Sequence, residues 1–266
     1  MATRLVVVLL IIISLVILFI KWKKSHLTIV TAHHKEDLDW LKKSESDVVV
    51  CDKAGADPMN FDSNSKCSME INRGREASSY LKYIIEHYDS LPNYVAFIHG
   101  HEDAWHQSGN ILDMINRAQK EKYSYISLNN RIDLKCENLP DEIHAGETGH
   151  LETHHPAFRL LMKKWDTIFE PILKIPKPDY LRFKCCAQFI VSRETILTHT
   201  KEEYQKLYDF AIDPSESDYV TGMALEFIWH VLFGEHYDTC KSDPNDPLHT
   251  DCNSKTYASS RFLSTV

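Results

Sequence analysis

The first half of the chain alternates short apolar runs with amphipathic segments, and this alternation constrains the fold more than any other feature. The runs at residues 27–32, 47–51 and 94–98 are rich in β-branched residues and short enough to be buried strands. Residues 76–88 instead show a strong helical spacing of apolar side chains, and residues 33–43 also favour a helix. We therefore expect an α/β domain with a mostly parallel central sheet covered by helices.

The second half of the chain carries a weaker version of this pattern. We expect short strands at residues 125–128 and 187–191, a long surface loop at residues 138–155 and a polar tail from about residue 235. About 240 residues follow the first 26, enough for one large domain or two small ones, and we expect one. The helices that we expect here lie at residues 111–119, 156–168, 201–210 and 219–233, within a domain at residues 27–266.

An apolar run near the N-terminus, residues 5–20, is broken only by Ser14. As a helix it would span roughly 24 Å, short of the roughly 30 Å hydrocarbon core, but flanking lysines can reach the interface. No small-x-small cleavage site follows, only the basic stretch at residues 21–24. We expect residues 1–26 to be a retained transmembrane signal anchor, and a cleaved signal peptide is the alternative.

This anchor predicts a single-pass membrane protein of the endoplasmic reticulum or Golgi, but it leaves the side of the membrane open. The lysines that follow the apolar run slightly favour a cytosolic domain. A short N-terminal tail, one anchor and a large C-terminal domain are instead the usual plan of luminal Golgi enzymes.

Charge and cysteine content narrow the range of partners. The formal net charge is −8 and no long basic run lies outside the membrane flank, which argues against nucleic acid and still permits a small anionic ligand. The seven cysteines are odd in number and show no C-x-x-C spacing, so a zinc ribbon or thioredoxin-like site has little support. A disulfide between Cys240 and Cys252 and a set of free buried thiols both fit the sequence.

Histidines and acidic residues gather at residues 99–103, directly after the third predicted strand. Open α/β sheets bind ligands beyond the carboxyl ends of their strands. His99 and His101 are two residues apart on an extended segment, so both can hold one metal, with Asp103 or His106 as a further ligand. The alternative is a polar loop whose histidines hydrogen-bond the backbone.

Two arginines flank a glycine just ahead of the strongest predicted helix. Gly74 permits a tight turn, and Arg73 and Arg75 lie beside the free N–H groups of the helix N-terminus, which together suit a phosphate or carboxylate. Glu76 would then complement the helix dipole or pair with an arginine. The alternative is an ordinary helix cap with solvated charges.

The late strand offers one polar side chain suited to face a ligand, Gln188. The adjacent Cys185 and Cys186 have no base nearby in the sequence, which argues against a cysteine nucleophile.

A carboxylate stands out in the last predicted helix. Glu226, Trp229 and His230 share one face of that helix by their spacing. A carboxylate among apolar residues is costly unless it is paired or serves as a tuned base. The alternative is a structural partner for Arg193 or Arg182.

In combination, these segments resemble the family of unknown function DUF3431. The resemblance rests on residues 74–76, 97–101, 185–193 and 226–230, and it covers residues 28–234. It implies no reaction. More loosely, the early strands, the polar cluster after the third strand and the late strand are similar to nucleotide-sugar glycosyltransferases of the GT-A type, which implies a GT-A-like (Rossmann-like) fold.

The glycosyltransferase similarity implies roles for two parts of the chain. In those enzymes a late segment lies near the acceptor, and a following carboxylate often serves as the base. Their Asp-x-Asp metal motif is missing here, and residues 99–103 occupy the comparable place.

Three hypotheses follow. The first is a membrane-anchored glycosyltransferase-like enzyme that transfers a sugar from a nucleotide-sugar donor to a hydroxyl acceptor, with Glu226 as general base and a divalent metal, manganese or zinc, as a cofactor. The second is a metal-dependent hydrolase that uses His99, His101, Asp103 and His106, and the third is a non-catalytic anchored binding module. The candidate residues are Glu226 and His101 for catalysis, His99, His101 and Asp103 for metal, and Arg73, Arg75, Trp105, Gln188, Arg193 and His230 for substrate.

Overall fold

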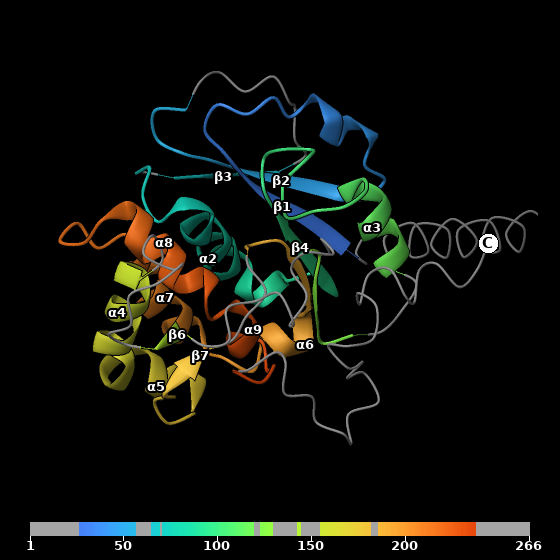
Figure 1. Cartoon of the computed structure of the whole chain (residues 1–266). Helices are drawn as coiled ribbons and strands as arrows, with labels where there is room; N and C mark the ends of the chain where they lie inside the picture. The colour runs from blue at the N-terminus through green and yellow to red at the C-terminus, as the bar shows by residue number, and fades with distance from the viewer. Residues whose placement is uncertain are drawn as a thin grey trace, which may run out of the picture.

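A six-stranded sheet with the order β3-β2-β1-β4-β8-β5 forms the centre of the domain (Figure 1). The computed structural model describes residues 27–56, 65–69, 71–119, 123–129, 143–144, 155–181 and 186–237. The strands of this sheet are β1 (Leu27–His33), β2 (Asp47–Asp52), β3 (Ser65–Ser68), β4 (Tyr94–Ile98), β5 (Tyr125–Ser127) and β8 (Phe189–Ser192).

One reversed strand makes this sheet mixed. β1 pairs in parallel with β2 and β4, and β2 with β3, whereas β8 runs antiparallel to both β4 and β5. The expectation of a mostly parallel sheet therefore holds only in part, because the direction of β8 depends on where the chain enters it and not on its residue pattern. A second sheet pairs β6 (Ile143–His144) with β7 (Tyr180–Leu181).

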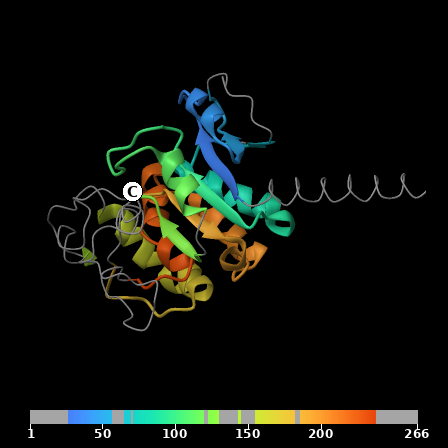
Figure 2. The ribbon, with the colours of Figure 1, turned by 90° about the vertical axis from the view of Figure 1, so that its right-hand side faces the viewer.

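Helices cover both faces of the large sheet, as its alternating side chains require. Val30 and Phe97 face a core shared with α2, α4, α7 and α8, whereas Ile29 and Ile98 face a second core shared with α3. Figure 1 and Figure 2 show the helices on the two sides of the sheet. The helices are η1 (Asp39–Lys43), α2 (Arg75–His87), η2 (Tyr88–Ser90), α3 (Ile111–Ala118), α4 (His155–Lys164), η5 (Trp165–Phe169), α5 (Glu170–Leu173), α6 (Arg193–Ile196), α7 (Lys201–Ala211), α8 (Asp218–Glu226) and α9 (Trp229–Leu232).

Most of the elements expected from the sequence are present, and two helices differ. The segment expected to be a helix at residues 33–43 contributes its first residue to β1 and forms only the short η1. The helix expected at residues 219–233 is interrupted at residues 227–228, where Ile228 has a φ of −123°. Glu226 therefore ends α8 and does not share one continuous helix with Trp229 and His230.

The predicted anchor, residues 1–26, lies outside the described residues, as does the tail beyond residue 237. Across the described ranges, no helix is both long enough and apolar enough to cross a membrane.

The cysteines of the described ranges are all bonded. Cys51 of β2 forms a disulfide with Cys67 of β3, its register partner, and Cys186 is also in a disulfide. The alternative of free buried thiols is therefore wrong for these three. The pair expected between Cys240 and Cys252 lies outside the described residues.

Candidate functional site at the carboxyl edge of the sheet

The strand order reverses between β1 and β4, which is where open α/β sheets bind ligands at their carboxyl edge. The segments that leave these two strands meet at Gly100. A Cβ at this position would lie 2.9 Å from Cγ of Glu36 and 3.0 Å from the carbonyl oxygen of Ala32. Trp40 also donates a hydrogen bond from Nε1 to the Gly100 carbonyl, at 3.3 Å. Because glycine has no side chain, the two segments can lie in close contact here.

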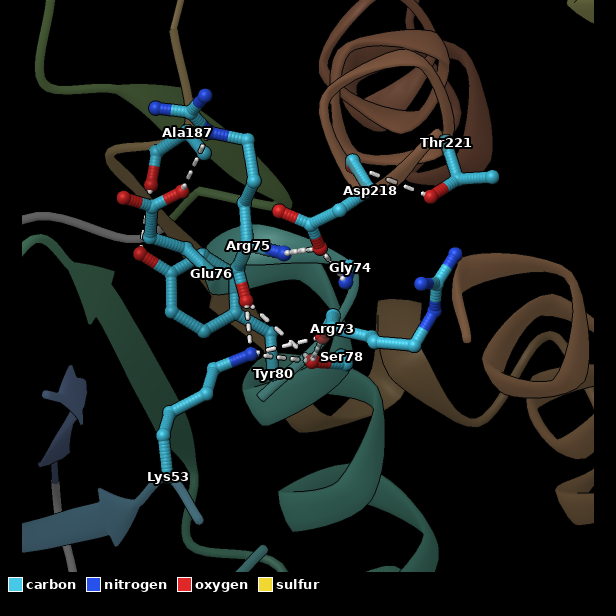
Figure 3. Close-up of polar contacts among 10 residues, drawn as sticks. All are labelled: Lys53, Arg73, Gly74, Arg75, Glu76, Ser78, Tyr80, Ala187, Asp218 and Thr221. Carbon is cyan, nitrogen blue, oxygen red and sulfur yellow. Dashed lines mark hydrogen bonds and ion pairs between the residues drawn. The ribbon is translucent and has the colours of Figure 1, made fainter. Parts of the chain in front are cut away.

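Lys53 follows β2 at the same edge and holds the start of α2 (Figure 3). Its side chain is only 5% exposed. Nζ donates to the carbonyl oxygens of Arg73, at 2.9 Å, and Arg75, and to Oγ of Ser78, at 2.6 Å. Burial lowers the pKa of Lys53 to about 8, although nearby carboxylates favour the charged form. At neutral pH the ammonium still predominates, so it can satisfy all three acceptors.

Asp218, at the start of α8, occupies the N-terminus of α2. Its Oδ1 accepts hydrogen bonds from the backbone N–H groups of Gly74 and, at 3.4 Å, Arg75 (Figure 3). A negative charge at this position is favourable because it complements the helix dipole. The phosphate or carboxylate expected at this helix N-terminus is thus supplied by the chain itself.

Arg75 and Glu76 form a partly exposed ion pair beside this helix start. Nε of Arg75 lies 3.9 Å from Oε2 of Glu76, and the two side chains are 42% and 26% exposed. Burial alone would raise the pKa of Glu76, but the ring of His99 in its protonated form, the backbone N–H and two cationic side chains hold it below its usual value. Glu76 is therefore an ionised carboxylate at neutral pH.

Glu226, at the end of α8, has the opposite protonation state. Burial, and secondly the charge of Glu76, raise the pKa of Glu226 to about 8, while Arg75 partly opposes this rise. Within the described residues Glu226 forms no ion pair. Two carboxyl groups whose surroundings push their pKa values apart are the usual arrangement of an acid and a base.

His99 lies between these groups and the loop that follows β4. Burial lowers the pKa of His99 despite the favourable charge of Glu76, so its ring is neutral at neutral pH. Its Nε2 is buried and has no hydrogen-bond partner within the described ranges. The ring centroid lies 5.1 Å from that of His106, which in turn lies 5.5 Å from the ring of Trp105. Trp105 is 63% exposed and forms the outer end of this row.

Gln188 fixes this loop to the start of β8. Its Oε1 accepts the backbone N–H of His99 at 3.2 Å, and its Nε2 donates to Oε1 of Gln107 at 3.0 Å. Because the side chain is fully buried, Gln188 positions His99 and does not itself face solvent.

Three of the proposed substrate residues lie apart from this group. Nη2 of Arg73 donates to the carbonyl oxygens of Asp213 and Glu216, at 2.8 and 2.6 Å, so its guanidinium holds the connection between α7 and α8. Arg193 lies at the opposite edge of the sheet, roughly 13 Å along the strands, because β8 is antiparallel and its last residue pairs with Tyr94. His230 is buried in α9.

The side chains proposed as metal ligands are not grouped around a common point in the described part of the chain. Within the described residues, no group of three His, Cys, Asp or Glu side chains is placed to hold a metal ion. The ring of His99 packs against that of His106, whereas the side chains of His101 and Asp103 are exposed. Glu102 contacts Asn110 instead, accepting a hydrogen bond at 3.2 Å.

The structure therefore brings together Arg75, His99 and Glu226 of the predicted residues, with His101 acting electrostatically on His99. The sequence interpretation missed Lys53, Asp218 and Gly222, which packs against the side chain of Arg75. Lys53 could have been found from its place directly after a buried strand, and Gly222 from its occurrence inside a helical pattern, where glycine usually has a packing reason.

The family described as "Protein of unknown function (DUF3431)" matches residues 28–246. No curated protein matches the chain.

Proposed function

The chain belongs to the family of unknown function DUF3431, and from its own site we propose that it is a glycosyltransferase-like enzyme. It would transfer a sugar from a nucleotide-sugar donor to a hydroxyl acceptor, at the carboxyl edge of a GT-A-like domain. The observation that carries the proposal is the contrast between Glu226, with a pKa of about 8, and the ionised Glu76, beside the exposed cation Arg75.

Glu226 has the properties of a general base for an acceptor hydroxyl. In the transfer, the hydroxyl oxygen bonds to the anomeric carbon, the bond from that carbon to the phosphate oxygen breaks, and the nucleoside diphosphate leaves. The hydroxyl proton moves to the ionised carboxylate of Glu226. A carboxylate with a pKa near 8 holds a proton more strongly than an ordinary one, which favours this step.

The other side chains of the group suit the donor. Arg75 is a cation that can form paired hydrogen bonds with phosphate oxygens. Nε2 of the neutral His99 ring is buried and has no partner in the described part of the chain, so it can hydrogen-bond a sugar or phosphate oxygen only where the bound ligand displaces the side chains that cover it. Trp105 offers an exposed flat face on which a ring of the ligand can pack.

A divalent metal, manganese or zinc, would stabilise the leaving diphosphate in such an enzyme. The side chains in the described ranges do not supply three ligands for one, so no step proposed here depends on it. The same observation gives the alternative of a metal-dependent hydrolase no support.

We also propose that the domain lies on the luminal side of the endoplasmic reticulum or Golgi membrane, held by residues 1–26. The disulfide between Cys51 and Cys67 supports this side, because disulfides persist in oxidising compartments and are rare in the cytosol. Protease treatment of intact microsomes tests it: a luminal domain is protected until detergent is added, and digestion without detergent would refute it.

The enzymatic proposal is tested with the purified full-length chain. UDP- and GDP-sugars, with and without Mn²⁺, are screened for a rise in Tm and for release of nucleoside diphosphate in the presence of acceptors. We expect at least one donor to stabilise the protein and to be consumed, and Glu226→Gln to abolish consumption while donor binding persists. Failure of every donor to bind would refute the proposal. Binding without turnover, unaffected by Glu226→Gln, would favour the non-catalytic binding module.

A further inference from the structure

The backbone of Arg75 is held in a conformation that side-chain-bearing residues rarely adopt. Its φ is 47°, directly after Gly74 with a φ of 72°. Left-handed backbone is unfavourable for arginine and persists only where the surroundings impose it, which happens most often at functional sites. Here Asp218 accepts the N–H of Arg75, and Lys53 donates to its carbonyl oxygen (Figure 3). The peptide groups on both sides of the Arg75 Cα are therefore held by hydrogen bonds.

The side chain of Arg75 is confined by α8 as well. A Cβ at Gly222 would lie 2.8 Å from Cγ, 2.9 Å from Cδ and 3.1 Å from Cβ of Arg75, so any larger residue would displace the arginine. The guanidinium carbon lies 5.4 Å from the ring centroid of Tyr219, within the range of a cation–π interaction. Tyr219 is itself one of the few large apolar side chains of the described residues that are exposed.

These constraints leave the guanidinium itself weakly engaged. Its ion pair with Glu76 is 3.9 Å long, beyond hydrogen-bonding distance, and the side chain remains 42% exposed. The alkyl part of the Arg75 side chain is thus tightly held, whereas its guanidinium is only weakly paired. This arrangement is suited to binding an external anion.

We infer that Tyr219 and Gly222 of α8 are positioning residues that present Arg75 to the phosphate oxygens of a diphosphate group, which then displaces Glu76 as its partner. The inference deepens the proposed function, because it assigns the recognition of the donor diphosphate to one side chain and its orientation to α8. Glu76, in turn, keeps the guanidinium in place while no ligand is bound.

The first test measures binding of inorganic pyrophosphate and UDP to the full-length protein by calorimetry. We expect Arg75→Ala and Gly222→Ala each to weaken binding roughly tenfold or more, since a charge-assisted hydrogen bond is lost. Tyr219→Phe, which retains the ring, should keep most of the affinity that Tyr219→Ala loses. Leu197→Ala is the matched control, because Leu197 is similarly exposed but follows α6 at the opposite edge of the sheet.

The second test needs no ligand. In a chain that already carries Arg75→Ala, Cγ and Cδ of residue 75 are gone and only the 3.1 Å contact with its Cβ remains. Because alanine also favours a helix more than glycine does, the change in Tm caused by Gly222→Ala should be more favourable in that chain. In the chain with Arg75 the same substitution should raise Tm less or lower it. Equal Tm changes in the two backgrounds would show that residues 75 and 222 are not coupled and would overturn the inference.

The two proposals fail in different ways. Arg75-dependent binding of pyrophosphate without any sugar transfer would leave the inference standing and remove the glycosyltransferase. The opposite result is sugar transfer together with an affinity for UDP and pyrophosphate that Arg75→Ala does not change. It would support the glycosyltransferase and refute the inference on Arg75. Absence of pyrophosphate and UDP binding to the unmodified protein would overturn the assignment of Arg75 to a diphosphate.

Discussion

Glu76 is ionised and Glu226 is mostly protonated at neutral pH, although both are glutamates at one edge of the sheet. The charge of protonated His99, a backbone N–H and then Arg75 and Lys53 hold the pKa of Glu76 below its usual value, although burial opposes them. Burial and the negative charge of Glu76 raise the pKa of Glu226 to about 8. The ionised member of the pair thus helps to keep the other protonated, and the predictions on acidity follow from this relationship.

Activity should depend on the ionisation of Glu226. If its carboxylate is the base, the rate of sugar transfer at saturating donor should rise with pH and level off above about 8. Glu226→Gln should reduce that rate roughly 10²- to 10⁴-fold, because an amide cannot accept the proton. A rate profile that is unchanged in Glu226→Gln would contradict the assignment of the base.

The free energy of unfolding should also depend on the ionisation of Glu226. Because the folded state raises the pKa of Glu226 from 4.5 to about 8, it binds more protons than the unfolded chain between these values. The contribution of this group is therefore fully present below about 4.5 and is lost as the pH rises through about 8. The free energy of unfolding, measured with urea below and above this pH window, should fall more in the unmodified protein than in Glu226→Gln. We expect the difference to be on the order of 1–2 kcal/mol, a figure that allows for the partial exposure of the side chain. Parallel pH curves for the two proteins would contradict this.

Lys53 should be one of the most sensitive positions outside the apolar core. Lys53→Met removes the ammonium that donates to the carbonyl oxygens of Arg73 and Arg75 and leaves them only the single hydroxyl of Ser78 as a shared donor among the described residues. We expect the free energy of unfolding to fall by about 2–4 kcal/mol, measured with urea. The control is Lys42→Met, because Lys42 is exposed and pairs only with Asp39; its effect should stay within about 0.5 kcal/mol. Equal effects of the two substitutions would refute the role of Lys53.

The disulfide between Cys51 and Cys67 should contribute to stability through the unfolded state. The cysteines are separated by 16 residues, and closing a loop of this size is worth about 3 kcal/mol. The double substitution Cys51→Ala with Cys67→Ala should lower the free energy of unfolding by about this amount. Peptide mapping without reduction should recover the two cysteines in one linked species, and separate peptides from the secreted or luminal protein would contradict the bond.

The elements that the sequence predicted well are those determined by local periodicity. β1, β2 and β4 follow from β-branched runs, and α2 from its amphipathic spacing, because each pattern is complete within a few residues. Their order along the chain also places their carboxyl ends at one edge. Arg75 and His99 follow a turn and a strand at that edge, and the charge of Arg75 acts on the pKa of His99.

The features that the sequence could not predict depend on partners far away in the chain. The direction of β8 determines that Gln188 lies at the site and Arg193 at the opposite edge, and no residue of the strand encodes that direction. Arg73 and Arg75 both flank Gly74 and look equivalent in the sequence. In the structure, hydrogen bonds to the carbonyl oxygens of residues 213 and 216 hold the guanidinium of Arg73 away from the site. Histidine spacing likewise predicted shared ligands without showing that the ring of His99 packs inward.

Because the carboxylate of Asp218 already occupies the amide groups that open α2, a ligand arriving there meets side chains and not bare backbone. A backbone N–H is present whatever the side chain is, except in proline, whereas a guanidinium is lost when a single residue is substituted. If residue 75 recognises the ligand, substitutions at this position and at its neighbours on α8 would change which molecule binds without changing the rest of the fold.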